Sequence, residues 1–174
     1  MKPTELDPIW EEAWKSKLIL PDQWMESAES IRAQGLTIAT LNGSFDLMHA
    51  GHLYILYEAT KVADCLIVAL NSDSSIQQYK SPDRPFIPLE YRLQMMAAIG
   101  WIDYVTWFDE IDPCVLLEKI RPDVHVNGVE YGNECIEAET VKKIGAQLHL
   151  VDRIPGLATT DILTKILQVH SIRQ

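Results

Sequence analysis

The chain has 174 residues, 47% of them hydrophobic, and its 25 acidic against 15 basic side chains give a formal net charge of -10. This length favours one domain with a sizeable core, and the acidity argues against a protein that grips nucleic acid through its phosphates. We expect a cytoplasmic protein without a secretory signal or a membrane span, because no apolar run is long enough. The three cysteines, Cys65, Cys114 and Cys135, have no Cys-x-x-Cys spacing, which favours reduced thiols.

The first 35 residues differ from the remainder of the chain. Three of the five tryptophans, Trp10, Trp14 and Trp24, fall in this segment. We expect residues 1–35 to form a Trp-rich helical extension that packs on a domain at residues 36–174 or on a second subunit. The apolar surface of this extension also favours a homodimer.

Short apolar runs alternate with helical patterns from residue 36 onward. Strands are predicted at residues 36–41, 65–70, 104–108, 124–126 and 147–151. Helices are predicted at residues 49–61, 88–99, 113–120 and 138–144, followed by a last helix from Thr159 or Thr160 to about Val169. This alternation predicts an α/β fold with a five-stranded, mostly parallel sheet covered by helices on both faces.

The segment NGSFDLMHAGH, residues 42–52, joins the first predicted strand to the first predicted helix. Open α/β sheets bind ligands at this edge, where helix N–H groups can hold an anion and glycines let it approach. His49 and His52 lie one turn apart and would donate two hydrogen bonds to one phosphate group. The alternative is that one histidine caps the helix and the other lies on the surface. The intervening Gly51 and the strand-to-helix position favour the phosphate site.

Other polar groups are candidates for the same edge of the sheet. Lys80 and Arg84 flank a turn-like stretch that can close over phosphates, although either can be a surface charge. Thr159 and Thr160 begin the last helix and can form a second anion site for the β- and γ-phosphates, or cap the helix.

Four further residues have two open interpretations each. Asp46 can orient a histidine or hold its loop, and Arg92 can bind an anion or pair with a carboxylate such as Glu90. Asn71 and Asp73 follow the second predicted strand, where they can touch a substrate or terminate the strand. None of these side chains is assigned as a metal ligand.

The arrangement His49-Ala50-Gly51-His52 resembles the His-x-Gly-His motif of the cytidylyltransferase-like nucleotidyltransferases. The resemblance extends to VALNSD, RPFIPLEYR, VNGVEY and GLATTDIL, at residues 68–73, 84–92, 126–131 and 156–163. Within this superfamily the chain is most similar to heptose 1-phosphate adenylyltransferases. The resemblance implies a Rossmann-like fold and transfer of AMP from ATP to a sugar phosphate, with release of pyrophosphate. It also implies Mg²⁺ bound through the triphosphate.

The resemblance assigns three groups of site residues. The catalytic residues would be His49, His52 and Lys80. The nucleotide and its phosphates would contact Asn42, Gly43, Ser44, Phe45, Gly51, Arg84, Asn127, Gly128, Glu130, Thr159 and Thr160. The acceptor would contact Asp46, Asn71, Asp73, Arg92 and Arg153.

Three departures from the heptose-type pattern leave alternatives open. Asn127 stands where those enzymes have lysine, and Ala158 stands where they have serine. Residues 153–160 resemble the glycerol 3-phosphate cytidylyltransferases, whereas residues 100–103 do not. We therefore favour ATP over CTP and retain a cytidylyltransferase acting on glycerol 3-phosphate or a similar phospho-alcohol as the alternative. A non-catalytic nucleotide-binding module is a second alternative, against which both histidines argue.

Overall fold

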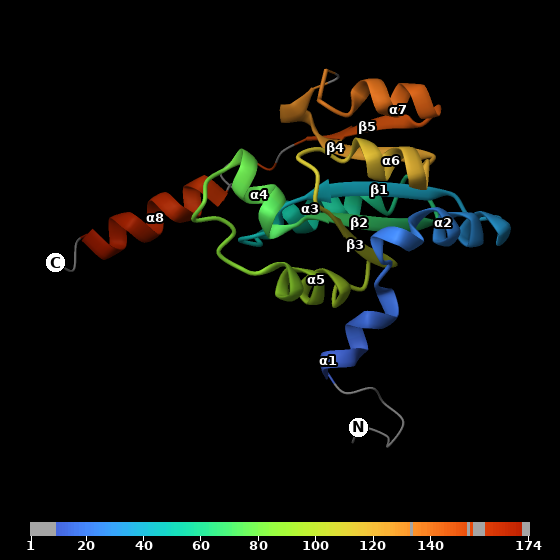
Figure 1. The fold of residues 1–174 in the computed structure, drawn as a ribbon. Helices are drawn as coiled ribbons and strands as arrows, with labels where there is room; N and C mark the ends of the chain where they lie inside the picture. The colour runs from blue at the N-terminus through green and yellow to red at the C-terminus, as the bar shows by residue number, and fades with distance from the viewer. Residues whose placement is uncertain (1–9, 133, 153, 155–158, 172–174) are drawn as a thin grey trace.

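The sheet is parallel throughout in the computed structural model, which describes residues 10–132, 134–152, 154 and 159–171 (Figure 1). Its strand order is β3-β2-β1-β4-β5. The strands are β1 (Ile38–Gly43), β2 (Cys65–Asn71), β3 (Tyr104–Phe108), β4 (Val124–Gly128) and β5 (Gln147–Val151). The predicted five-stranded α/β architecture is therefore confirmed, and β1 lies at its centre, which places the loop after β1 in the middle of the ligand-binding edge.

Helices cover both faces of the sheet because the buried strands alternate their side chains between two cores. In β2, Leu66 and Val68 join one core with α3 and α5, whereas Cys65 and Ile67 join the other core with α2, α6 and α7. The longer helices are α2 (Trp24–Ala33), α3 (Ala50–Ala59), α5 (Leu89–Ala97) and α8 (Thr159–Ser171). The shorter ones are α1 (Trp10–Ala13), η1 (Trp14–Lys17), η2 (Pro21–Gln23), α4 (Asp73–Tyr79), α6 (Cys114–Ile120), η3 (Val129–Tyr131) and α7 (Ala138–Ile144).

One α-helix of the described residues was absent from the sequence expectation. The segment DSSIQQY forms α4, and Ser72 caps it by accepting a hydrogen bond from the Ser75 N–H. Its serines and glutamines carry no apolar periodicity, so the sequence pattern did not reveal a helix. Because α4 directly follows β2, it places Lys80, its C-terminal cap, at the same edge of the sheet as the loop after β1.

The segment before β1 packs on the outer side of β3. Leu18 forms a parallel bridge with Val105, and the Ile19 N–H donates to the Val105 carbonyl at 2.9 Å. Trp24 is buried, and its indole Nε1–H donates to Thr106 Oγ1 at 2.7 Å. Residues 1–9 of the expected extension lie outside the described residues. Because Trp24 is used inside the fold, it does not supply apolar surface for a partner.

Two further observations bear on the sequence expectations. Cys65, Cys114 and Cys135 are all free thiols, and burial beside Asp103 and Asp64 raises the pKa of Cys65 to about 12. Among the helices of the described ranges, none combines the length and the apolar character that crossing a bilayer requires.

Candidate functional site

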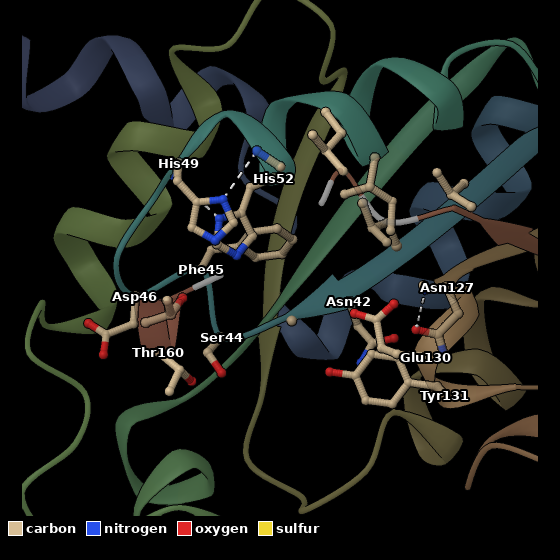
Figure 2. A pocket seen from close by; sticks show the side chains of 18 of the residues that line it. Asn42, Ser44, Phe45, Asp46, His49, His52, Asn127, Glu130, Tyr131 and Thr160 are labelled. Carbon is tan, nitrogen blue, oxygen red and sulfur yellow. Dashed lines mark hydrogen bonds between the residues drawn. The ribbon is translucent and has the colours of Figure 1, made fainter. Parts of the chain in front are cut away.

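A pocket opens where β1, β4 and β5 end and α3 and α8 begin, and Figure 2 shows it from close by. The lining includes fifteen of the predicted contact residues: Asn42, Gly43, Ser44, Phe45, Asp46, His49, Gly51, His52, Lys80, Arg84, Asn127, Gly128, Glu130, Thr159 and Thr160. Asn71, Asp73 and Arg92 are not part of the lining, and Arg153, like Ala158, lies outside the described residues. Segments distant in the sequence thus meet at the ligand-binding edge of the sheet.

His49 and His52 form a reciprocal cap at the start of α3. The Gly51 N–H donates to His49 Nδ1 at 3.1 Å, and the His49 N–H donates to His52 Nδ1 at 3.3 Å. Because each neutral ring accepts at Nδ1, its proton is assigned to Nε2. The capping interpretation is therefore correct for His49, and capping fixes both rings as Nε2–H donors rather than excluding that role.

The environment keeps His52 uncharged. Burial, followed by the neighbouring charges of His49 and Lys80, lowers the pKa of His52 from its ordinary 6.5 to about 4. The two rings lie 4.0 Å apart between centroids, so protonating one disfavours protonating the other. At neutral pH the His52 Nε2–H can therefore donate a hydrogen bond to a ligand without the ring carrying a charge.

This shift predicts a particular pH dependence. The unfolded chain binds the His52 proton near pH 6.5 and the folded protein near pH 4, so stability is fully present above pH 6.5 and declines toward pH 4. We expect the ring proton resonances of His52, assigned by their loss in His52→Gln, to titrate near pH 4 in an NMR experiment. A midpoint near 6.5 would contradict the geometry described above.

Phe45 shapes the loop that carries the histidines. Its backbone has a φ of 46°, a left-handed conformation that is costly for a bulky residue, by about 1–2 kcal/mol. The ring is buried and meets His52 edge-on at 5.5 Å between centroids. A Cβ on Gly43 would lie 3.1 Å from this ring. A side chain at position 43 would therefore crowd the Phe45 ring, a constraint that the sequence pattern alone did not reveal.

Arg92 holds the same loop from behind. Its guanidinium is fully buried and donates to the carbonyls of Ser44 at 2.6 Å and Asn71 at 2.9 Å, while Nη2 pairs with Asp73 at 2.6 Å. Its Nε donates to the Ile87 carbonyl. These contacts tie the loop after β1 to the end of β2 and the start of α4. Arg92, Asp73 and Asn71 thus support the pocket wall.

Asp46 joins the histidine loop to residues 84–87. It accepts hydrogen bonds from the Phe86 and Ile87 N–H groups and from Arg84, whose Nη2 lies 2.6 Å from Oδ2. Burial alone would raise the pKa of Asp46, but these donors outweigh it and hold the pKa below its usual value. Of its two predicted interpretations, the structure shows the one in which Asp46 holds the loop.

Lys80 reaches the pocket from the end of α4. Its ammonium donates to Ser44 Oγ at 2.8 Å, and the same hydroxyl lies 2.7 Å from the Tyr79 hydroxyl. Burial and the nearby Arg84 lower the pKa of Lys80. The charge of Arg84 is already neutralised by Asp46. The hydrogen-bond acceptor of Lys80 is the neutral Ser44 hydroxyl, so its positive charge can bind an anion.

The sequence of this protein matches one known family. A model of cytidylyltransferase-like proteins matches residues 40–166, which is more than half of the chain. The chain belongs to the cytidylyltransferase-like family. The predicted family, its Rossmann-like fold and its nucleotidyltransferase character are thereby confirmed.

Curated relatives of this chain are longer than it is. Bifunctional protein HldE of Syntrophotalea carbinolica is 38% identical over 155 residues, which are 88% of this chain and 32% of that protein. HldE of Alcanivorax borkumensis is 41% identical over 145 residues, covering 83% and 30%. The chain thus spans about a third of the length of the curated relatives it matches.

Solved structures show the same cytidylyltransferase-like fold. A lipopolysaccharide core biosynthesis protein from Thermoplasma volcanium has a TM-score of 0.56 and 26% identity, and the match covers 69% of this chain and 98% of that one. A pantoate-beta-alanine ligase from Francisella tularensis has a TM-score of 0.60 at 16% identity, covering 90% and 80%, and therefore supports the fold alone.

Several lining residues were missed by the sequence reasoning. They are Leu41, Ile55, Tyr131, Val151, Asp152 and Ile154. Tyr131 and Asp152 had a usable signal, because each follows a predicted strand at the edge where open α/β sheets bind ligands. The apolar lining residues carried no such signal, since an apolar residue in a pocket wall and one in the core look alike in sequence.

Proposed function

We propose that the protein transfers AMP from ATP to heptose 1-phosphate, forming ADP-heptose and releasing pyrophosphate. The observation that carries this proposal is the pair of Nε2–H donors, His49 and His52, beside Lys80 in a pocket at the end of β1. The similarity to the bifunctional HldE proteins, at 38% identity over 88% of the chain, supports heptose phosphate as the acceptor.

In this mechanism a phosphate oxygen of the sugar attacks the α-phosphorus of ATP. A new P–O bond forms, the bond from the α-phosphorus to the bridging oxygen breaks, and that oxygen leaves with pyrophosphate. The imidazoles and the Lys80 ammonium stabilise the negative charge that builds up on the phosphoryl oxygens. No covalent nucleophile is needed, and the start of α8, where Thr159 and Thr160 line the pocket, suits the leaving phosphates.

We also propose that Mg²⁺ accompanies the triphosphate. Asp46 neutralises Arg84, so the positive charge around the pocket is too small to balance the negative charge of a triphosphate. Within the described residues no three His, Cys, Asp or Glu side chains gather into a metal-binding group, and Asp46 is committed to its loop. Triphosphate oxygens and water would therefore supply most ligands, and Mg²⁺ would neutralise their charge.

A substrate panel tests the proposed reaction. We expect Mg²⁺-dependent pyrophosphate release with ATP and heptose 1-phosphate, and loss of that release when EDTA removes the metal. The panel crosses ATP and CTP with heptose 1-phosphate, glycerol 3-phosphate and other sugar phosphates. Release with CTP and glycerol 3-phosphate would move the assignment to the cytidylyltransferase alternative. ATP binding without release under any pair would favour a non-catalytic module.

We further propose a cytoplasmic homodimer in which α8 packs against a second copy. This helix extends away from the sheet (Figure 1) and exposes Ile166 and Val169, which lie one turn apart and are 55% and 43% accessible. A thirteen-residue helix is marginal in water unless its apolar side is covered. A second copy offers an identical apolar stripe across a two-fold axis.

Light scattering after gel filtration tests this dimer. We expect the parent protein to have twice the chain mass and Ile166→Glu with Val169→Glu to have the chain mass, because two buried carboxylates would oppose the contact. Gln168→Glu adds a charge elsewhere on the same helix and should leave the dimer intact. A monomeric parent protein would refute the proposal.

A further inference from the structure

A chain of buried polar groups runs from the middle of the sheet to one end of the pocket. Thr40 Oγ1 lies 2.9 Å from His125 Nδ1, and His125 Nε2 lies 3.5 Å from Glu137 Oε1. The same carboxylate oxygen accepts a hydrogen bond from Asn127 Nδ2 at 2.6 Å. All four side chains are buried, yet only Asn127 lines the pocket. The other three reach the ligand space through it.

Burying this row of polar groups inside the protein costs free energy. Glu137 is 4% exposed, and burying a carboxylate requires compensating donors. Burial would raise its pKa, but the neighbouring His125 ring, 3.5 Å away, and a backbone hydrogen bond outweigh that effect and hold the pKa of Glu137 below its usual value. A negative charge therefore stands directly behind Asn127. Apolar side chains would fill this part of the sheet at lower cost, so the polar groups point to a positioning role.

The network fixes the orientation of the Asn127 amide. Its nitrogen donates to Glu137, and its oxygen accepts from the Gly128 N–H at 2.9 Å, so the amide cannot turn over without losing both bonds. Glu130 folds back against Gly128, since a Cβ built on that glycine would lie 2.3 Å from Glu130 Oε2. This end of the pocket therefore presents oxygen acceptors backed by negative charge.

The two ends of the pocket thus have opposite character. Figure 2 shows Asn127 and Glu130 grouped on one side, with His49 and His52 on the other. The histidine end, which also holds Lys80, offers donors and suits phosphate. Carboxylates at the Asn127 end repel phosphate and attract hydroxyl and amine hydrogens.

We propose that Thr40, His125 and Glu137 are positioning residues that hold Asn127 in the orientation that binds the unphosphorylated, hydroxyl- or amine-bearing part of a substrate. The inference rests on the proposed function, because it takes ATP and a sugar phosphate as the substrates. Both the nucleoside and the sugar carry such groups, and the experiment below separates them.

The test is calorimetric titration with ATP, pyrophosphate and heptose 1-phosphate, each added alone so that no turnover occurs. We expect Glu137→Gln and His125→Leu each to weaken ATP binding about tenfold, with pyrophosphate binding unchanged within about twofold. The affinity of the double variant for ATP should also fall about tenfold rather than a hundredfold, because both residues act on the ligand through Asn127. Glu139→Gln removes the same charge from an exposed site on α7 and is the matched control.

The outcomes separate cleanly. A loss for heptose 1-phosphate in place of ATP supports the network and identifies the sugar as the group held. Unchanged affinities in folded variants, additive losses, or an equal loss for pyrophosphate would each overturn the proposal. Melting temperatures report folding, and Asn127→Ala with Glu137→Gln completes the cycle if His125→Leu does not fold. Failure of the parent protein to bind ATP would instead refute the proposed function.

Discussion

Replacing His52 or His49 by alanine should lower kcat by about 100-fold or more, with a smaller change in KM for ATP. Each change removes an Nε2–H donor aimed at charge that develops in the transition state, and loss of one such donor typically costs that much. Each change also removes half of the reciprocal cap, which the Nδ1 atoms of the two rings form at the start of α3. Steady-state pyrophosphate release measures both constants.

The matched control for these variants is His149→Ala. His149 lies on β5 and is not part of the pocket lining, so its loss should leave turnover close to that of the parent protein. Turnover within about threefold of the parent in either His49→Ala or His52→Ala would refute stabilisation of the transition state by these side chains.

Arg92→Met should destabilise the protein by about 3 kcal/mol. The methionine fills similar space but leaves the carbonyls of Ser44, Asn71 and Ile87 without the donors that Arg92 supplies in a buried site. Because two of these carbonyls belong to the loops that shape the pocket, we also expect activity to fall. Urea unfolding gives the free energy, with kcat measured in parallel.

Two variants make the Arg92 result specific. Arg92→Lys keeps the charge but lacks the fork that reaches several acceptors, so it should lose an intermediate amount of stability. Lys142→Met removes an exposed cation from α7 and should change the free energy of unfolding by about 0.5 kcal/mol or less. Equal stability of Arg92→Met and the parent would show that the buried guanidinium is dispensable.

The sheet was predictable because its strands are short apolar runs with clear boundaries. Residues 65–70 were predicted and β2 covers Cys65–Asn71, since a fully buried parallel strand reads as continuous apolar sequence. By contrast, α4 was not predictable, because DSSIQQY has no apolar stripe and depends on the Ser72 cap and on contacts such as Ser75 Oγ with the Glu110 carbonyl. Those contacts join segments distant in sequence.

The candidate site likewise contains residues whose roles could be predicted from the sequence and residues whose roles could not. His49 and His52 were predictable because their spacing and the strand-to-helix junction are local properties. The role of Arg92 was not, since its acceptors come from three separate segments of the chain and a surface cation looks the same in sequence. The link from His125 to Glu137 was also invisible, because it joins a strand residue to the N-cap of α7 twelve positions later.

The bridge between Leu18 and Val105 has a consequence for aggregation. β3 is a border strand of the sheet, and a border strand exposes a row of unpaired amides that can recruit another molecule. Pairing of Ile19 with Val105 occupies part of that row, and burial of Trp24 shields the neighbouring apolar surface. A shortened protein that began at Leu36 would expose this part of the β3 edge and the apolar surface that Trp24 covers. The segment before β1 therefore protects the sheet from edge-to-edge association between molecules.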